Sequence, residues 1–142
     1  MYITFEQFQN MGGTLDETTF EEYEFEARCI VNLYTYHRLK KMDTSEYPEE
    51  LSRCMYALIK LIQAQWALIP GSQNDGAGGS AGAKGVASAS NDGVSVGFAT
   101  LSAQDLLDTC RDEISKLIKT YLSGVLDSLG HRLLYTGIYP DE

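Results

Sequence analysis

The sequence predicts a mainly α-helical protein: a small bundle of three longer helices plus a short N-terminal helix, with a β-hairpin inserted before the last long helix. Three long segments carry apolar residues at alternating steps of three and four, which is the spacing of one buried helix face. Between the last two segments, apolar and small residues alternate with the period of two that is typical of a strand. A chain of 142 residues suits one modest core, so we expect a single domain over residues 1–142.

The first predicted helix is short. Thr4 stands three residues before Gln7, which is the spacing of a capping box, where each side chain binds a backbone N–H near the other residue. This predicts a helix over residues 5–10. Gly12 and Gly13 then end it.

The second helix is expected over about residues 17–36. Asp16, or one of the threonines that follow it, offers the N-cap. The predicted buried face consists of Phe20, Tyr23, Ala27, Ile30 and Tyr34. Glu22, Glu24 and Glu26 fall mostly off that face and are expected in solvent. Residues 37–42 form a basic helical extension or a turn.

The third and fourth helices follow the same logic. Pro48 suits the first turn of the third helix, and Pro70 ends it. Its apolar stripe is wide enough for the centre of a bundle or a subunit contact: Leu51, Cys54, Met55, Leu58, Ile62, Trp66 and Ile69. Ser102 is the expected cap of the last helix, whose stripe is Leu107, Cys110, Ile114, Leu117, Tyr121 and Val125.

The segment between these helices contains two kinds of sequence. Residues 71–85 are rich in glycine, alanine and serine, and they are expected to be a flexible insert. Residues 86–99 are expected to form the hairpin, because Val94, Val96 and Phe98 alternate with small residues after an Asp-Gly turn signal.

Composition excludes several classes of protein. There are 20 acidic and 11 basic side chains, a net charge of −9, so a nonspecific phosphate-binding surface is not expected. No apolar run has the length of a membrane span, and the first ten residues lack the pattern of a secretory signal. The three cysteines are far apart, which predicts reduced thiols buried in the helical stripes and a cytosolic setting.

No catalytic constellation is apparent. His37 and His131 stand outside any metal-ligand spacing, and the cysteines show no CxxC pair. The glycine-rich insert does not match a phosphate-binding loop, because Lys84 is followed by Gly85 in place of a hydroxyl residue. We therefore expect no enzyme activity, no cofactor and no metal.

Aromatic residues are the more informative surplus. Nine tyrosines are present, and six lie outside the main stripes or at their edges: Tyr2, Tyr36, Tyr47, Tyr56, Tyr135 and Tyr139. They either pack the ends of helices or build an interface, since tyrosine offers a large contact area with a polar tip. The apolar run at residues 133–139 poses the same alternative: it folds back, or it pairs with a partner.

Several short motifs occur in an order that resembles a known family. They are Met11-Gly12-Gly13, Glu26-Ala27-Arg28, Arg38-Leu39, Pro48-Glu49, Arg53-Cys54-Met55, Ser90-Asn91-Asp92-Gly93-Val94-Ser95-Val96, Tyr121-Leu122-Ser123-Gly124 and Leu133-Leu134-Tyr135-Thr136-Gly137-Ile138. Over nearly its whole length the chain resembles the head-tail connector (head-completion adaptor) proteins of tailed phages and prophages of Gram-positive bacteria. The glycine-rich insert at 71–85 is longer and looser than that family pattern.

The resemblance implies a structural virion protein of the capsid-tail neck, made in the cytoplasm of the bacterial host. Such connectors form a homo-oligomeric ring on the portal protein, extend the DNA channel and carry the next neck or tail protein. Double-stranded DNA passes without sequence-specific binding, and an acidic lining would favour sliding. The free chain is compatible with a monomer, because its interfaces need the portal as a template.

The resemblance also implies roles for two segments. The hairpin would face the channel or a neighbouring subunit with Ser90, Asn91, Asp92, Gly93, Val94, Val96 and Phe98. The C-terminal arm, residues 131–142, would dock on the portal with Leu133, Leu134, Tyr135, Ile138 and Tyr139.

Two other interpretations remain open. The chain could be another phage neck or DNA-packaging component, or a helical protein-interaction module that forms no ring. A small helical enzyme is the remote third class, since no catalytic set converges.

Overall fold

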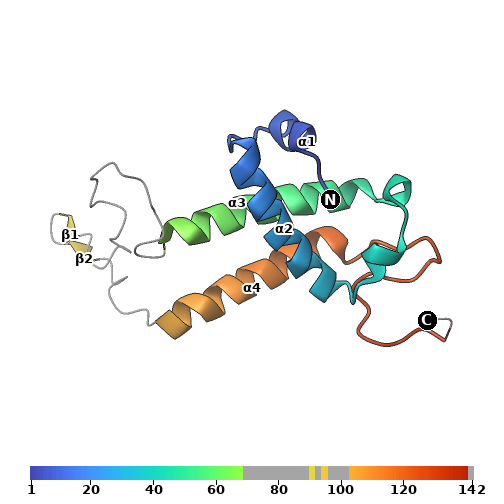
Figure 1. Ribbon diagram of the computed structural model, residues 1–142. Helices are drawn as coiled ribbons and strands as arrows, with labels where there is room; N and C mark the ends of the chain where they lie inside the picture. Colours follow the sequence, from blue (N-terminus) through green and yellow to red (C-terminus); the bar gives the residue numbers. More distant parts are fainter. Residues whose placement is uncertain (69–89, 92–93, 96–102, 141–142) are drawn as a thin grey trace. The chain divides into compact units, whose positions relative to one another are not determined.

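The structure is a computed structural model that describes residues 1–68, 90–91, 94–95 and 103–140. The described chain is mainly helical. Its α-helices are α1 (Phe5–Asn10), α2 (Glu17–Tyr34), α3 (Glu49–Leu68) and α4 (Ala103–Leu122), and two short 3-10 helices, η1 (Arg38–Lys41) and η2 (Thr44–Glu46), join α2 to α3 (Figure 1). The predicted helix positions agree with these bounds to within a few residues, because caps, prolines and apolar periodicity are local signals.

The chain divides into two compact units. The first comprises residues 1–62 and 114–142, and the second comprises residues 63–113. The first unit holds the whole core cluster described below, so the candidate site is built there.

Helix α1 begins with the predicted capping box. The Gln7 backbone N–H donates to Thr4 Oγ1 at 3.2 Å, and the Thr4 backbone N–H donates to Gln7 Oε1 at 2.9 Å. The helix buries one large side chain, Phe8, whose ring packs against Phe20 of α2 at 5.0 Å between centroids. The aromatic pair fixes α1 against the start of α2, and Figure 1 shows the two helices beside each other there.

Helix α2 is capped by Asp16, one of the three predicted candidates. Its carboxylate accepts hydrogen bonds from the Thr19 backbone N–H at 3.0 Å and from the Thr19 hydroxyl at 2.8 Å. These bonds lower the pKa of the Asp16 carboxyl, since they favour its charged form.

The buried face of α2 differs from the predicted one. Phe20, Ala27 and Val31 are buried, but Glu24 is buried with them at 1% exposure, whereas Tyr23 is only half-buried. The expectation that Glu24 lies in solvent is therefore wrong. Its position was readable from spacing, because residues 20, 24, 27 and 31 recur at steps of four, three and four. The acidic side chain of Glu24 is the one feature of this series that favours solvent.

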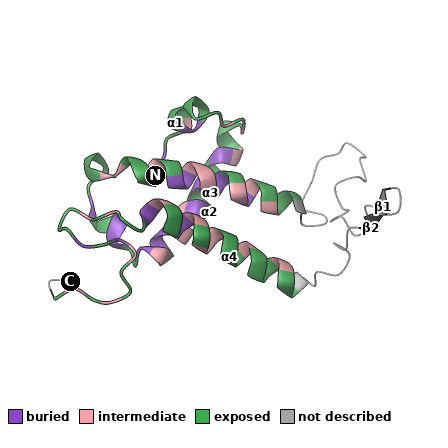
Figure 2. Ribbon diagram, turned by 180° about the vertical axis from the view of Figure 1, so that it is seen from behind, coloured by how far each residue is buried: buried purple, intermediate pink, exposed green. Residues whose placement is uncertain are grey.

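The core of the first unit is formed by α2, the first part of α3 and the end of α4. Figure 2 shows the buried positions along these helices. The buried apolar side chains of α3 and α4 are Leu51, Cys54, Met55, Leu58, Ile59, Ile62, Ile118 and Leu122. Within α4, by contrast, Leu107 is 52% exposed, so the predicted core stripe of that helix is not buried at its start.

The predicted fold class is wrong in its β-hairpin. The chain is mainly helical, and the hairpin of residues 86–99 is not seen. The described pairing consists of β1 (Ser90–Asn91) and β2 (Val94–Ser95), antiparallel, with Ser90 opposite Ser95 and Asn91 opposite Val94. Each of these strands has two described residues. A typical strand has about five to six residues, which is the length that was predicted for residues 94–99. The rest of residues 86–99 lies outside the described residues, as do the insert 71–85 and the expected cap Ser102.

No helix in the described part of the chain is long and apolar enough to cross a membrane. The prediction of one domain over residues 1–142 stays a prediction.

Gly13 offers a test of the packing between α1 and the core. Its backbone N–H donates to the Phe8 carbonyl at 2.9 Å, and a Cβ added there would collide with the buried Phe8 ring. We expect Gly13→Ala to lower the free energy of unfolding by about 1–3 kcal/mol, because overpacking forces the ring or the backbone to move. Chemical denaturation measures this change.

Gly124→Ala is the matched control, since a Cβ at Gly124 meets nothing within 4 Å. It should change the unfolding free energy by no more than about 0.5 kcal/mol. Equal stabilities for the two variants would contradict the tight packing at Gly13.

Candidate functional site

The candidate site is the C-terminal segment, residues 131–139, together with Arg38 of η1, which binds its backbone. The segment was predicted either to fold back or to pair with a partner. Leu133 is 0% exposed and belongs to the core, so this part of the segment folds back. The Leu133 backbone N–H donates to the Val125 carbonyl at 3.1 Å, and Leu126 and Arg132 form an isolated antiparallel bridge.

Arg38 holds this segment in place. The chain after α2 turns sharply through Tyr36 and His37, which have left-handed φ angles of 51° and 60°. Non-glycine residues in that region cost about 1 kcal/mol each, so the surrounding packing must offset the strain. The turn starts η1 and directs Arg38 inward, where only 2% of the residue is exposed.

The buried guanidinium donates to four backbone carbonyls of the C-terminal segment. Nη1 lies 3.3 Å from the oxygen of Arg132, 3.2 Å from that of Leu133 and 2.6 Å from that of Tyr135. Nη2 lies 2.8 Å from the oxygen of Gly137. The planar fork of arginine can serve several acceptors at once, so one side chain fixes the path of residues 132–137.

The ring of Tyr139 packs against both His131 and Arg38. Tyr139 stacks on His131 with 3.9 Å between centroids and 10° between planes, and its ring lies 5.2 Å from the Arg38 guanidinium carbon. The Tyr139 hydroxyl accepts a hydrogen bond from the Arg132 backbone N–H at 3.0 Å. His131 therefore packs within this segment.

An aspartate shapes the turn before the segment. Asp127 Oδ1 accepts from the backbone N–H of Leu129 at 2.9 Å and of His131 at 2.8 Å, and its Oδ2 lies 3.3 Å from His131 Nδ1. Gly130 has a φ of +83°, a conformation that glycine adopts at no steric cost. The turn between α4 and the segment is thus specified by local chemistry.

The five predicted portal-docking residues do not form one exposed surface. Leu133 is buried, Leu134 and Tyr139 are half-buried, and Tyr135 and Ile138 are exposed, Ile138 at 86%. The segment thus presents chiefly Ile138 and Tyr135 to the outside. Nothing in the structure tests whether a portal binds them, so docking stays a prediction.

The predicted hairpin residues are only partly described. Ser90 and Asn91 lie in β1 and Val94 lies in β2, whereas Asp92, Gly93, Val96 and Phe98 lie outside the described residues. Their role toward a channel or a neighbour stays a prediction.

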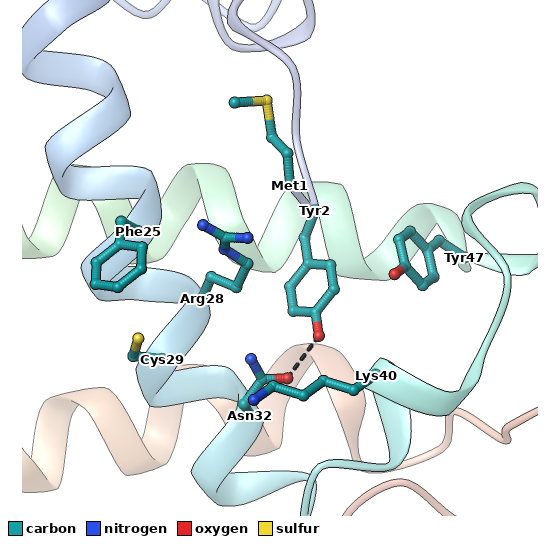
Figure 3. A pocket seen from close by; sticks show the side chains of 8 residues that line it. All are labelled: Met1, Tyr2, Phe25, Arg28, Cys29, Asn32, Lys40 and Tyr47. Carbon is teal, nitrogen blue, oxygen red and sulfur yellow. Dashed lines mark hydrogen bonds between the residues drawn. The ribbon is translucent and has the colours of Figure 1, made fainter.

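A second feature of the first unit is a surface pocket of about 530 Å³ beside the N-terminal residues (Figure 3). The Tyr2 hydroxyl donates to Asn32 Oδ1 at 2.5 Å, and the Tyr2 ring meets the Tyr47 ring edge-on at 5.2 Å. The pocket is lined by Met1, Tyr2, Phe25, Arg28, Cys29, Asn32, Lys40 and Tyr47. No sequence motif predicts this pocket, because its residues lie far apart along the chain.

A buried carboxylate, that of Glu24, contacts two residues of the pocket. Glu24 Oε1 accepts a hydrogen bond from the Tyr2 backbone N–H at 2.9 Å, and Glu24 Oε2 lies 3.4 Å from Arg28 Nε. The Arg28 guanidinium in turn lies 5.4 Å from the centre of the Phe25 ring. The burial of Glu24 thus has a structural reason: it joins the N-terminal segment to α2.

The three thiols differ in environment. Cys54 is buried as predicted, and burial raises the pKa of its thiol to about 12. Cys110 is half-buried, with a pKa raised by burial and then by Glu113. Cys29 is exposed, so the expectation that it is buried in the α2 stripe is wrong. Among the described residues, no three His, Cys, Asp or Glu side chains form a group that could hold a metal ion.

Comparisons of the chain with protein-family models, with curated proteins and with solved structures found no match.

Removing the Arg38 fork should release the C-terminal segment. Arg38→Ala removes a donor from four carbonyls, of which that of Leu133 is buried, so we expect the free energy of unfolding to fall by about 2–4 kcal/mol. Hydrogen exchange of the backbone amides at 132–137 should rise more than that of α1. Arg53→Ala is the control, because Arg53 pairs with Glu49 on the exposed surface. Equal protection of residues 132–137 in both variants would contradict the anchoring role.

Tyr2 should make stability depend on alkaline pH. Burial, and next the Tyr47 hydroxyl, raise the pKa of Tyr2 from 10.0 to about 12. The unfolded chain therefore loses this proton first, and the stability contribution, full below pH 10, disappears as the pH rises to about 12. Denaturation at pH 9 to 12 should show a smaller decline in Tyr2→Phe than in the wild type, and equal declines would contradict the burial of this hydroxyl.

Proposed function

We propose that this chain is a ring-forming head-tail connector of a tailed phage or prophage, which docks on the portal, extends the DNA channel and carries the next neck or tail component. The proposal starts from the order of short motifs along the sequence. It is supported by a small helical unit whose C-terminal segment exposes the large side chains of Tyr135 and Ile138. Such a unit can bind partners through its surface.

The observation that carries the proposal best is the anchored C-terminal segment. Arg38 fixes its backbone through four carbonyls, while Ile138 projects at 86% exposure. A large apolar side chain on a fixed backbone loses little conformational freedom on binding, which is the property of an interface anchor. Docking on the portal through this segment is the corresponding proposal.

DNA enters the proposal only as a passing polymer. The net charge of −9 disfavours adhesion to phosphate, so an acidic channel wall would let the duplex slide. Localisation in the capsid-tail neck, after synthesis in the host cytoplasm, belongs to the same proposal.

The test combines the purified chain with the portal protein encoded in the same genome. We expect rings on the portal by electron microscopy, with portal binding measured by calorimetry. Ile138→Asp should weaken that binding at least about tenfold, because a charge would enter the apolar contact. Truncation at residue 133 is a poorer experiment, since it removes the buried Leu133 and the acceptors of Arg38.

Leu107→Asp is the matched control, because Leu107 is an exposed leucine in the other unit, at 52%. Unchanged portal binding by Ile138→Asp would refute docking through the C-terminal segment. A chain that stays monomeric and never binds the portal would refute the connector function and favour a helical interaction module. A ring channel lined mainly by lysine and arginine would refute the acidic conduit.

A further inference from the structure

The charges at the start of the chain are segregated. Residues 1–27 contain seven acidic side chains and no basic one, whereas residues 28–41 contain four basic side chains and no acidic one. Both stretches lie in the first unit and include most of α2. The boundary between the two signs falls within the helix, at Arg28.

The helix dipole does not account for this segregation. A dipole stabilises acids in the first turn and bases in the last turn of a helix. Glu17 is the acidic residue of the first turn, while Glu21 and Glu22 lie beyond it, and the last turn of α2 has no basic residue. Glu24 and Arg28 pair within the helix and Arg38 binds the C-terminal segment, so the charges left to explain are chiefly the exposed acidic side chains and Lys40.

An exposed row along α2 combines charge with apolar surface. Glu17, Glu21, Phe25, Cys29 and Leu33 follow one another at steps of four, and all five are exposed. Phe25 is 61% exposed and Leu33 is 66% exposed. Residues four apart are neighbours on a helix surface, so the row is acidic at one end and apolar at the other.

The apolar end of the row borders the pocket of Figure 3, which also carries positive charge. Phe25 and Cys29 belong to both. Of the two basic side chains of the pocket, Arg28 pairs with the buried Glu24, and Lys40 is exposed. The exposed acidic side chains Glu17, Glu21 and Glu22 lie at the opposite end of α2. With a rise of about 1.5 Å per residue, Glu17 and Leu33 are about 24 Å apart along α2. The acidic and apolar ends of this helix therefore cannot contact each other within one chain.

We propose that the apolar row and the basic pocket form a docking surface for the acidic N-terminal end of α2 in a second copy of this chain. The occupant follows from charge complementarity, because the chain itself carries the acidic counterpart of the pocket. The contact joins two different faces, so every copy keeps one free face for the next. The inference rests on the proposed ring and assigns the surface between its subunits.

Disulfide trapping tests this contact with the native Cys29 as one partner. Thr18 is exposed among the acidic side chains, so Thr18→Cys places a second thiol on the opposite face. Within one chain, residues 18 and 29 are about 16 Å apart on α2, which is too far for a disulfide. Cys110→Ser in every variant removes the half-buried thiol of α4.

We expect mild oxidation of Thr18→Cys/Cys110→Ser to produce a ladder of linked dimers, trimers and larger species on a non-reducing gel. Adding Cys29→Ser should abolish the ladder. Absence of the ladder, both for the free chain and for the chain mixed with the portal protein, overturns the proposal and leaves the surface to another acidic protein or to none. A dimer formed by Cys110→Ser alone would indicate a symmetric Cys29 contact and would also overturn it.

Charge exchange supplies a second test on the same gel. In the cysteine background, Lys40→Glu alone, or Glu17→Lys/Glu21→Lys alone, should slow cross-linking up to about fivefold, as expected for exposed ion pairs. An equal mixture of the two proteins should recover the rate, because each reversed face then meets its opposite. A mixture that stays as slow as either protein alone contradicts the pairing.

The two proposals fail separately. Rings on the portal without the 18–29 link would overturn this contact and leave the connector function standing. A ladder formed by a chain that never binds a portal would overturn the connector function and leave this contact standing.

Discussion

The first unit depends on one buried cation. Arg38 donates to the carbonyls of residues 132, 133, 135 and 137, and without it the buried Leu133 carbonyl would lose this donor. Burying a guanidinium is costly unless its hydrogen bonds are made, so the arginine and the C-terminal segment require each other. This mutual requirement also explains the left-handed turn at Tyr36 and His37, which directs Arg38 inward. The hydrogen bonds of Arg38 offset the backbone strain at Tyr36 and His37.

A second polar network plays the same part at the other terminus. Glu24 accepts the Tyr2 backbone N–H and lies beside Arg28, and the Tyr2 hydroxyl donates to Asn32. Both networks thus attach a chain segment to α2 or to the loop that follows it. As a result, α2 has a buried polar and apolar side and an exposed row. The docking surfaces proposed for the portal and for a second copy lie on the outside of segments that are fixed from within.

Local signals predicted the helices well and their faces less well. The capping box at Thr4, the cap at Asp16 and the proline at 48 act through neighbouring residues, so the starts of α1, α2 and α3 could be derived. The predicted buried face of α2 was wrong at Glu24. Its spacing from Phe20 and Ala27 is that of a core position, although its side chain is acidic. The hairpin prediction was wrong, because alternation over six residues indicates only that a strand is possible. Contacts with neighbouring segments decide whether the strand forms.

The sequence by itself determined the helical class, the helix boundaries and the segregation of charge, since each follows from residues within a few positions of one another. The tertiary structure alone decided which polar groups are buried and where the C-terminal segment lies. Arg38 and its acceptors are 94 to 99 positions apart, and no periodicity links them. Contacts at that separation arise only when the core brings the two segments together, because a buried charge has no local preference for its distant partner.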